Sequence, residues 1–143
     1  MFQVETSHAD RMIVVRMSGV LSIEEAHACA AAKEAAVESM GSLARGHCTM
    51  VDIRELRLHP QEVFAIFTHF VATTKRKSRK IAIVAGEGTA RMQFRRVAES
   101  APLRGDMRFF PTAAAARDWL RDDAMEVSQP ALRPASPRLP LAG

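Results

Sequence analysis

CTMVDIRELRLHPQEVFAIFTHFV, residues 48–71, predicts a strand, a polar connection and a helix, and we expect the rest of the fold to be built around this unit. Residues 48–53 are short, mostly apolar and rich in β-branched side chains, which predicts a strand covered on both faces. The His59-Pro60 pair marks a helix start, because proline at the first helical position loses no hydrogen bond. Side chains at helical spacing then predict a broad buried stripe: Val63, Ile66, Phe67, Phe70 and Thr74.

Two strands and a helix precede this segment. Phe2–Glu5 and Met12–Met17 are separated by a short turn, which predicts an antiparallel hairpin. Ser22-Ile-Glu-Glu25 is a capping box, and Gly41 supplies a stop after about Met40. The face of this helix that is expected to point inward carries Ile23, Ala26, Ala30, Val37 and Met40.

Two further strand–helix pairs follow. Lys80–Ala85 predicts a buried strand, and a glycine-containing turn leads into a helix over residues 90–100. The inward side chains of that helix are expected to be Ala90, Phe94, Val97 and Ala98. Met107–Phe110 is the last strand, and Pro111-Thr112 opens a final helix.

The chain ends in a segment of different composition. Four of its seven prolines lie in residues 129–143, where no periodicity is visible. Such a composition is typical of disordered segments. We therefore expect one domain, residues 1–122, and a disordered proline-rich tail, residues 123–143.

The predicted element order is β-β-α-β-α-β-α-β-α. Strands that alternate with helices require crossover connections and a parallel arrangement. The fold class is therefore α/β, with a mixed, largely parallel sheet of four to five strands, an N-terminal β-hairpin and about four helices.

Several of these segments resemble one family. Val15–Ala26 is similar to the strand, glycine, turn and Ser-x-Glu-Glu helix that open STAS-like proteins, in particular the SpoIIAA-like group. The fold of that group is also similar to the lipid-binding CRAL-TRIO domain. The likeness covers roughly residues 1–122 and continues through Val51–Leu56, Ile81–Ala85, Ala90–Phe94 and Phe109–Leu120.

The resemblance implies a regulatory module that binds another protein. Anti-sigma-factor antagonists of this type carry a phosphorylated serine at the start of the helix after the central strand. This chain has His59-Pro-Gln-Glu62 there, without a hydroxyl group. The nearest hydroxyls, those of Thr49 and Thr68, fall inside the predicted strand and helix. We therefore expect the phosphorylation switch to be missing.

No pattern of reactive or metal-binding residues is found. The sequence contains no Gly-x-Ser-x-Gly elbow, and its five histidines form neither a His-x₃-His pair nor a His-Glu-x-x-His motif. Surface or capping roles are therefore expected for the histidines. Cys29 and Cys48 are expected to be buried thiols of a reducing compartment. We therefore expect no enzyme activity, no metal site and no cofactor.

Polar residues at the carboxyl ends of two strands form the candidate site. In open α/β sheets this edge holds the binding crevice. We expect a partner or ligand site there, made by Asp52, Arg54, His59, Gln61, Gly86, Gly88, Arg91 and Arg95. The alternative is that Asp52 caps a neighbouring turn while Arg54 and His59 are solvated. Gly86-Glu-Gly88 lacks the third glycine of a dinucleotide fingerprint.

The net charge of +4 is concentrated in one segment. Residues 75–108 carry ten basic and three acidic side chains. Nucleic acid is not an expected partner, because tyrosine is absent and the aromatic residues lie at core spacing, so no stacking platform is present. A solvated basic face is favoured, and an acidic protein partner is the next alternative. No apolar run is long enough to span a membrane.

Two functions fit these observations. The first is a non-catalytic, cytoplasmic interaction module that binds a protein partner through the surface around Arg54–Glu62; a homodimer is an alternative. The second is a carrier of a small apolar or anionic ligand, such as a lipid or nucleotide, held in the crevice between residues 52–59 and 86–91. The carrier hypothesis predicts a cavity lined by Phe64, Phe67 and Phe94.

Overall fold

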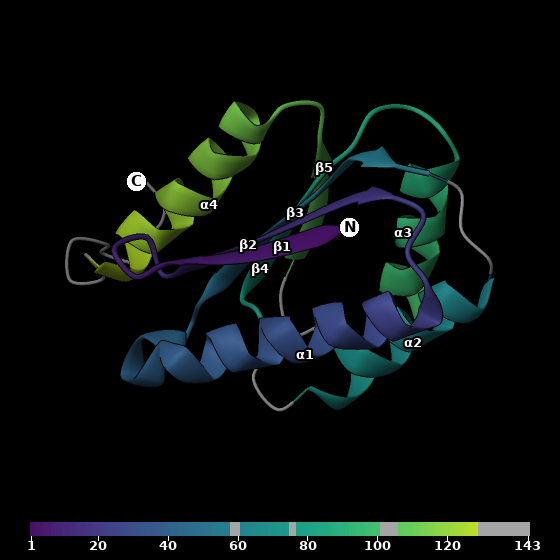
Figure 1. Ribbon diagram of the computed structural model, residues 1–143. Helices are drawn as coiled ribbons and strands as arrows, with labels where there is room; N and C mark the ends of the chain where they lie inside the picture. Colours follow the sequence, from purple (N-terminus) through teal and green to yellow (C-terminus); the bar gives the residue numbers. More distant parts are fainter. Residues whose placement is uncertain (58–60, 75–76, 101–105, 129–143) are drawn as a thin grey trace.

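The computed structural model describes residues 1–57, 61–74, 77–100 and 106–128 (Figure 1). The predicted helix start at His59-Pro60 and the prolines of the tail lie outside the described residues. The side chains of Ala90 and Ala98, two positions that were expected to face inward, are also outside the described part.

The secondary structure elements follow the predicted order. Their bounds are β1 Phe2–Ser7, β2 Met12–Gly19, α1 Ile23–Ser39, η1 Gly41–Ala44, β3 Cys48–Leu56, α2 Gln61–Thr73, β4 Lys80–Val84, α3 Thr89–Ser100, β5 Asp106–Phe110 and α4 Ala113–Ser128. The short 3₁₀ helix η1 is an addition to the prediction. Helix α4 continues beyond the domain limit at residue 122 because neither proline nor glycine interrupts residues 113–128.

The five strands form one mixed sheet in the order β1-β2-β3-β4-β5. β1 pairs with β2 in the antiparallel direction, and the other three pairs are parallel. β3 lies in the middle of the sheet, between β2 and β4. The predicted fold class, with its N-terminal hairpin and largely parallel sheet, is confirmed.

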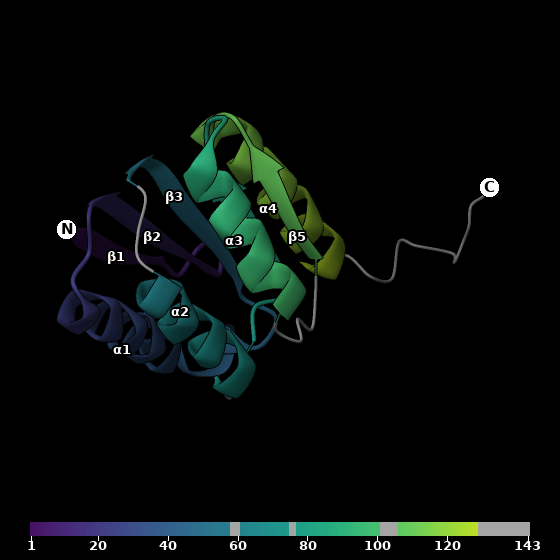
Figure 2. The same cartoon turned by 90° about the vertical axis from the view of Figure 1, so that its right-hand side faces the viewer.

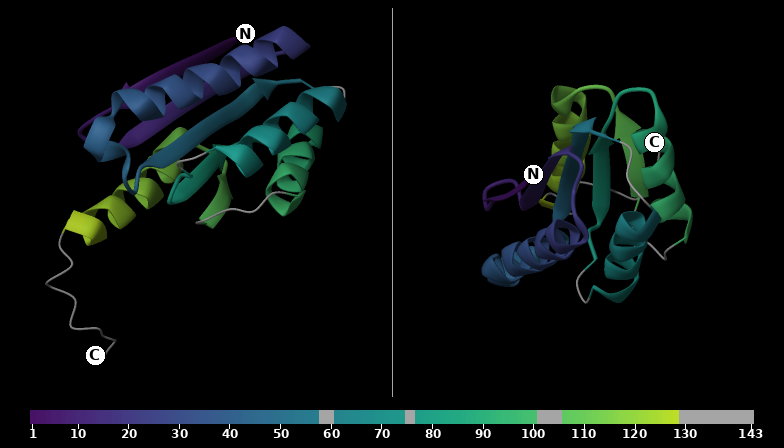
Figure 3. Two further views of the ribbon diagram at one scale, coloured as in Figure 1. Left: turned by 90° about the horizontal axis from the view of Figure 1, so that it is seen from below. Right: turned by 45° about the vertical axis from the view of Figure 1, so that its right-hand side comes forward.

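The helices lie on both faces of the sheet. Each crossover from β2 to β5 moves one strand in the same direction, so right-handed connections place α1, α2 and α3 on one face. α2 lies between α1 and α3 on that face (Figure 2). α4 follows the last strand and packs on the other face, against β3, β4 and β5 (Figure 3).

Two apolar clusters fill the space between these layers. The larger lies under α1, α2 and α3 and includes Ile13, Val15, Val37, Phe67 and Ile83. The smaller lies under α4 and includes Met12, Val14, Met50, Val84 and Leu120. Alternate residues of β2 enter different clusters because successive strand side chains point to opposite faces.

The capping box predicted at the start of α1 is confirmed, but one side chain that was predicted to be buried is exposed. Ser22 Oγ accepts a hydrogen bond from the Glu25 amide at 3.0 Å, and the Ser22 amide donates to Glu25 Oε1 at 3.1 Å. Ala26 and Val37 are buried as predicted, whereas Ile23 is 49% exposed. The prediction that Ile23 is buried was therefore wrong. A helical stripe is buried only where another element runs alongside it, and Ile23 is the first residue of α1.

Candidate functional site

A row of side chains crosses the sheet on the face that carries α4. The strand register aligns Gln3 with Arg16, Arg16 with Asp52, and Asp52 with Val84. Val84 is buried in the cluster under α4. The other three line a pocket on the part of this face that is formed by β1, β2 and the end of β3. We call the surface made by Gln3, Arg16, Asp52 and Arg54 the open face.

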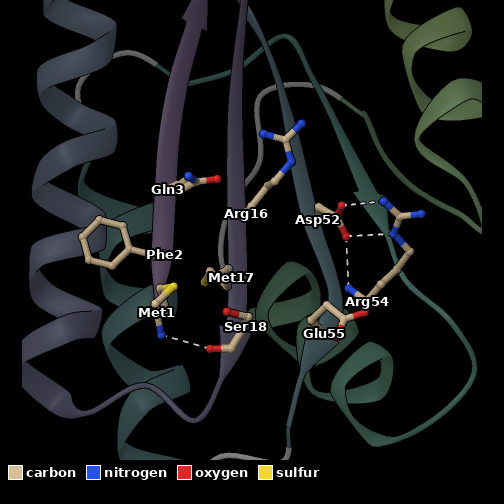
Figure 4. A pocket seen from close by; sticks show the side chains of 9 residues that line it. All are labelled: Met1, Phe2, Gln3, Arg16, Met17, Ser18, Asp52, Arg54 and Glu55. Atoms are coloured by element: carbon tan, nitrogen blue, oxygen red, sulfur yellow. Dashed lines mark hydrogen bonds and ion pairs between the residues drawn. The ribbon is translucent and has the colours of Figure 1, made fainter.

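Asp52 and Arg54 form a bidentate ion pair on β3 (Figure 4). Arg54 Nε lies 3.0 Å from Asp52 Oδ1, and Nη2 lies 2.7 Å from Oδ2. The Arg54 amide also donates to Oδ1 at 3.1 Å. These hydrogen bonds, the side-chain bond from Arg54 first, hold the pKa of Asp52 below its ordinary value and raise the pKa of Arg54. The carboxylate therefore stays ionised and fixes the guanidinium.

Asp52 lies between Arg16, its partner on the neighbouring strand β2, and Arg54 of its own strand β3 (Figure 4). Arg16 Nη1 lies 3.0 Å from Glu5 Oε1, and both side chains remain substantially exposed. The pocket at this place has a volume of about 280 Å³. Its wall mixes apolar and charged side chains: Met1, Phe2, Gln3, Arg16, Met17, Ser18, Asp52, Arg54 and Glu55. The open face can therefore present paired charges beside apolar contact area.

The other candidate residues have different surroundings. The guanidinium groups of Arg91 and Arg95 lie 5.3 and 5.7 Å from the centre of the Phe109 ring. Gly86 and Gly88 belong to the exposed turn before α3, and Gly88 has a φ of 133°. No residue of this group lines the pocket at Asp52.

Gln61 lines an open groove that also contains residues of α3, among them Gln93 and Arg96. His59 lies outside the described residues. The structure thus brings together Asp52 and Arg54 from the candidate set and places the remaining described members elsewhere.

The strand topology explains this distribution. A crevice forms at the carboxyl edge of a parallel sheet where the strand order reverses and successive crossover helices pass to opposite faces. Strands β2 to β5 follow each other without reversal, so no switch point separates β3 from β4. The strand order therefore contains no reversal that would form the expected crevice between residues 52–59 and 86–91.

Two residues of the open face were missed by the sequence reasoning. Gln3 and Arg16 lie on strands that the sequence predicts. The signal that could have found them is the alternation of polar and apolar residues along these strands. Gln3 and Glu5 are exposed, while Phe2 and Val4 pack against the larger core cluster. Register then decides which polar residue of one strand meets which residue of the next.

A buried polar network lies at the other end of β3, where this strand begins. His47 Nδ1 lies 2.8 Å from the carbonyl oxygen of Ala44, so this nitrogen carries the proton and Nε2 is the acceptor. Nε2 accepts from Ser78 Oγ at 3.1 Å, and Ser78 Oγ lies 2.6 Å from Thr49 Oγ1. His47, Thr49 and Ser78 are almost fully buried. Their burial closes this serine–histidine pair to a substrate, and we assign it a structural role.

The two cysteines are buried as predicted, and Thr49 and Thr68 lie inside the predicted strand and helix. Cys29 and Cys48 are free, buried thiols, and burial raises the pKa of both, to about 11 for Cys29. Thr49 is buried in β3, and Thr68 Oγ1 donates to the Phe64 carbonyl oxygen within α2 at 2.9 Å. Neither hydroxyl is presented on a turn.

Two features are absent from the part of the chain that the structure describes. Within it, no group of three or more His, Cys, Asp or Glu residues could hold a metal ion. None of its helices is long and apolar enough to cross a membrane.

Comparisons with known proteins agree with the architecture. A crystal structure of an uncharacterised protein of the DUF3478 family with a SpoIIAA-like fold, from Shewanella loihica PV-4, is 22% identical with a TM-score of 0.64, covering 84% of this chain and 92% of that chain. The anti-sigma factor antagonist SpoIIAA in its unphosphorylated form is 15% identical with a TM-score of 0.57, covering 85% and 98%. At these identities the likeness shows the fold.

The comparison with curated protein sequences gives no significant match. The profile of the SpoIIAA-like family matches residues 12–121, which include β2 to β5 and most of α4. The chain belongs to the SpoIIAA-like family.

Proposed function

We propose that this chain is a non-catalytic protein-interaction module whose binding surface is the open face. The observation that carries the proposal is the bidentate pair between Asp52 and Arg54. A guanidinium that is already fixed loses less conformational entropy when it binds a partner than a freely rotating one does. The anti-sigma factor antagonist with a similar fold bears a name that denotes action on another protein, which favours the same kind of role here.

The chemistry of the open face describes the partner surface. The Arg54 side chain is 44% exposed and the Arg16 side chain 39%, so each can donate further hydrogen bonds. Arginine forks match carboxylates in bidentate geometry. The partner therefore presents acidic side chains to Arg16 and Arg54, next to an apolar residue that contacts Met1, the exposed apolar side chain of the pocket wall.

The absence of a hydroxyl in the His59–Glu62 segment favours regulation without phosphorylation of that segment. The alternative carrier function at residues 52–59 and 86–91 is not favoured, because no described residue of the second segment lines the pocket at Asp52.

The aromatic cavity that the carrier hypothesis predicts is present in part. Phe67 and Phe94 line an apolar cavity of about 100 Å³ under α1, α2 and α3, whereas Phe64 packs edge-on against Phe94, with ring centres 5.2 Å apart, and does not line it. An engineered cavity of about 150 Å³ takes benzene, so this cavity is too small for a lipid chain or a nucleotide. We therefore place the function on the open face.

The experiment is site-specific photo-crosslinking in the native host. A photoreactive residue at Gln3, which is exposed and lines the pocket, is expected to capture a partner. The same residue at Glu38, exposed on α1, is the control position. The crosslink at Gln3 should be lost in Arg54→Glu and retained in Arg45→Glu, a matched charge reversal at an exposed residue elsewhere.

Truncation after Ser128 separates the open face from the tail. Retained crosslinking supports the proposal, whereas a partner captured by residues 129–143 alone contradicts it. A crosslink between two copies of the chain would identify a homodimer as the complex. Equal capture in the Arg54→Glu variant would assign the partner to another surface.

A further inference from the structure

β5 is the last strand of the sheet and has a free edge. Its neighbour is β4, and no other strand that the structure describes pairs with it. Figure 2 looks toward this edge, with α3 and α4 on the two sides of β5. The open face is built on β1, β2 and the end of β3, so β4 separates it from this edge. The two surfaces are therefore distinct.

The backbone of β5 leaves hydrogen-bonding groups at the free edge. The Ala85 amide donates to the Phe110 carbonyl oxygen at 3.0 Å, so the backbone groups of Phe110 point toward β4. Backbone groups of successive strand residues point to opposite sides, so those of Arg108 also face β4, whereas those of Met107 and Phe109 face away from it. Met107 and Phe109 therefore each offer one N–H and one C=O to an incoming strand.

Positively charged side chains lie on both sides of the free edge. On the α3 side, the guanidinium groups of Arg91 and Arg95 lie over the Phe109 ring, 5.3 and 5.7 Å from its centre. On the α4 side, the guanidinium of Arg108 lies 5.1 Å from the centre of the Trp119 ring. Arg95 and Arg108 are exposed. An incoming strand therefore meets cations on either face.

Arg91 and Arg95 have no carboxylate partner among the described residues. Glu99, one turn after Arg95 on α3, is exposed and does not form an ion pair with it. A guanidinium that rests on an aromatic ring is restrained, so it loses less conformational entropy when it binds a carboxylate. The planar fork of arginine also matches a carboxylate in bidentate geometry. These two side chains are therefore prepared for an acidic partner.

We propose that the free edge of β5 binds an extended acidic segment of another protein, which adds one strand to the sheet. Hydrogen bonds to the backbone of Met107 and Phe109 hold the added strand, as in other cases of strand addition. Its side chains alternate between the two faces, so every second residue reaches the α3 side. Acidic residues at these alternate positions pair with Arg91 and Arg95. The proposal does not depend on the open face.

Two other occupants are less complementary to this edge. A second copy of the chain, paired through β5, would bring the arginines of both copies together, where like charges repel. Residues 129–143 contain two arginines, four prolines and no acidic residue. The arginines of that segment would be repelled as well, and its prolines cannot donate to a strand ladder.

The test on the natural chain uses an acetylated and amidated peptide, Glu-Val-Glu-Val-Glu-Val, followed by NMR. Binding should slow the exchange of the Met107 and Phe109 amide protons with solvent, because each gains an acceptor. The amide protons of Arg108 and Phe110, which face β4, should change little. Absence of binding at millimolar peptide, or binding without slower exchange at Met107 and Phe109, would overturn the proposal.

Two methylated peptides separate strand pairing from attraction between charges. One carries N-methyl groups on its glutamates and the other on its valines, so both keep the charge and each loses alternate N–H donors. One of the two should bind about tenfold more weakly than the other or worse, because only one set of N–H groups faces β5. Loss on methylation of the glutamates indicates an antiparallel strand, and loss on methylation of the valines indicates a parallel one. Equal affinities would overturn strand addition.

A matched pair of charge reversals on α3 tests the arginines. Arg95→Glu should weaken peptide binding by about fivefold or more, because an attraction is replaced by a repulsion. Arg96→Glu reverses the next residue, which lines the groove toward α2, and should change the affinity by less than about twofold at physiological salt. Thermal melting checks that both variants fold. Unchanged affinity in Arg95→Glu, or an equal loss in Arg96→Glu, would show that the arginines only protect the edge from association and would overturn the proposal.

Discussion

His47 Nε2 lies 3.1 Å from Ser78 Oγ, although the two residues are 31 positions apart in the sequence. The pair joins the start of β3 to the segment before β4, and Thr49 and Lys33 contact the same hydroxyl. An unpaired polar group at this depth is unfavourable, so these side chains stabilise one another.

Removal of the Ser78 hydroxyl is expected to destabilise the fold. Ser78→Ala leaves two buried groups, His47 Nε2 and the Thr49 hydroxyl, without this hydrogen-bond partner. The free energy of unfolding should fall by about 1–3 kcal/mol in urea titrations. Ser42→Ala, at an exposed position in η1, should change it by less than about 0.5 kcal/mol. An equal effect of both substitutions would contradict a stabilising network.

Because of Lys33, the free energy of unfolding should depend on pH in the alkaline range. Its pKa falls from 10.5 to about 8 on folding because the ammonium is desolvated, with Glu34 opposing the shift. Between these values the unfolded chain binds more protons, so the free energy of unfolding rises with pH. Below about pH 8 both states hold the proton, and the cost of burying the charge is fully present.

Lys33→Met should therefore be more stable than the natural chain at neutral pH, by on the order of 2 kcal/mol. This advantage should shrink as the pH rises from about 8 to 10.5. Urea titrations at several pH values measure the difference. A constant difference across that interval would show that Lys33 titrates at its ordinary pKa.

Asp52 should contribute stability that is lost in acid. Its pKa is depressed in the folded state by the hydrogen bond from Arg54, so the contribution is present above the unfolded value and disappears as the pH falls through the folded value. Asp52→Asn should lower the free energy of unfolding by about 0.5–1 kcal/mol at pH 7, because Arg54 is partly solvated. The difference from the natural chain should shrink as the pH falls below the ordinary aspartate value and disappear once Asp52 is protonated in the folded state.

Glu55→Gln is the matched control for that substitution, since Glu55 neighbours the pair and is exposed. It should show little change at either pH. A double-mutant cycle with Arg54→Ala isolates the coupling between Asp52 and Arg54. A coupling energy of zero would show that the pair adds no stability.

The capping box should set the stability of α1. Ser22→Ala removes the acceptor for the Glu25 amide, and about 1 kcal/mol of stability should be lost. Glu24→Gln changes a first-turn residue outside the box and should cost less. Urea titrations followed by circular dichroism compare the two. A larger loss for Glu24→Gln would assign the effect to the helix dipole.

The local pattern of the sequence determined the elements and their order. The strand over residues 48–53, the capping box at Ser22 and the glycine stop at Gly41 are encoded by neighbouring residues, and the structure contains all three. Alternation of strands and helices also determined the largely parallel sheet, because short crossovers leave few other arrangements.

Which side chains meet depends on strand register and on the packing of the helices against the sheet. Periodicity states which face of an element is buried, but it does not specify the partner across a strand pair or between layers. The alignment of Arg16 with Asp52 follows from register, and the contact of Lys33 with Ser78 follows from the packing of α1 on the sheet. Of the candidate residues that the structure describes, Asp52 and Arg54 line the pocket on the open face and the others do not, and the strand order lacks the reversal on which the crevice rule depends.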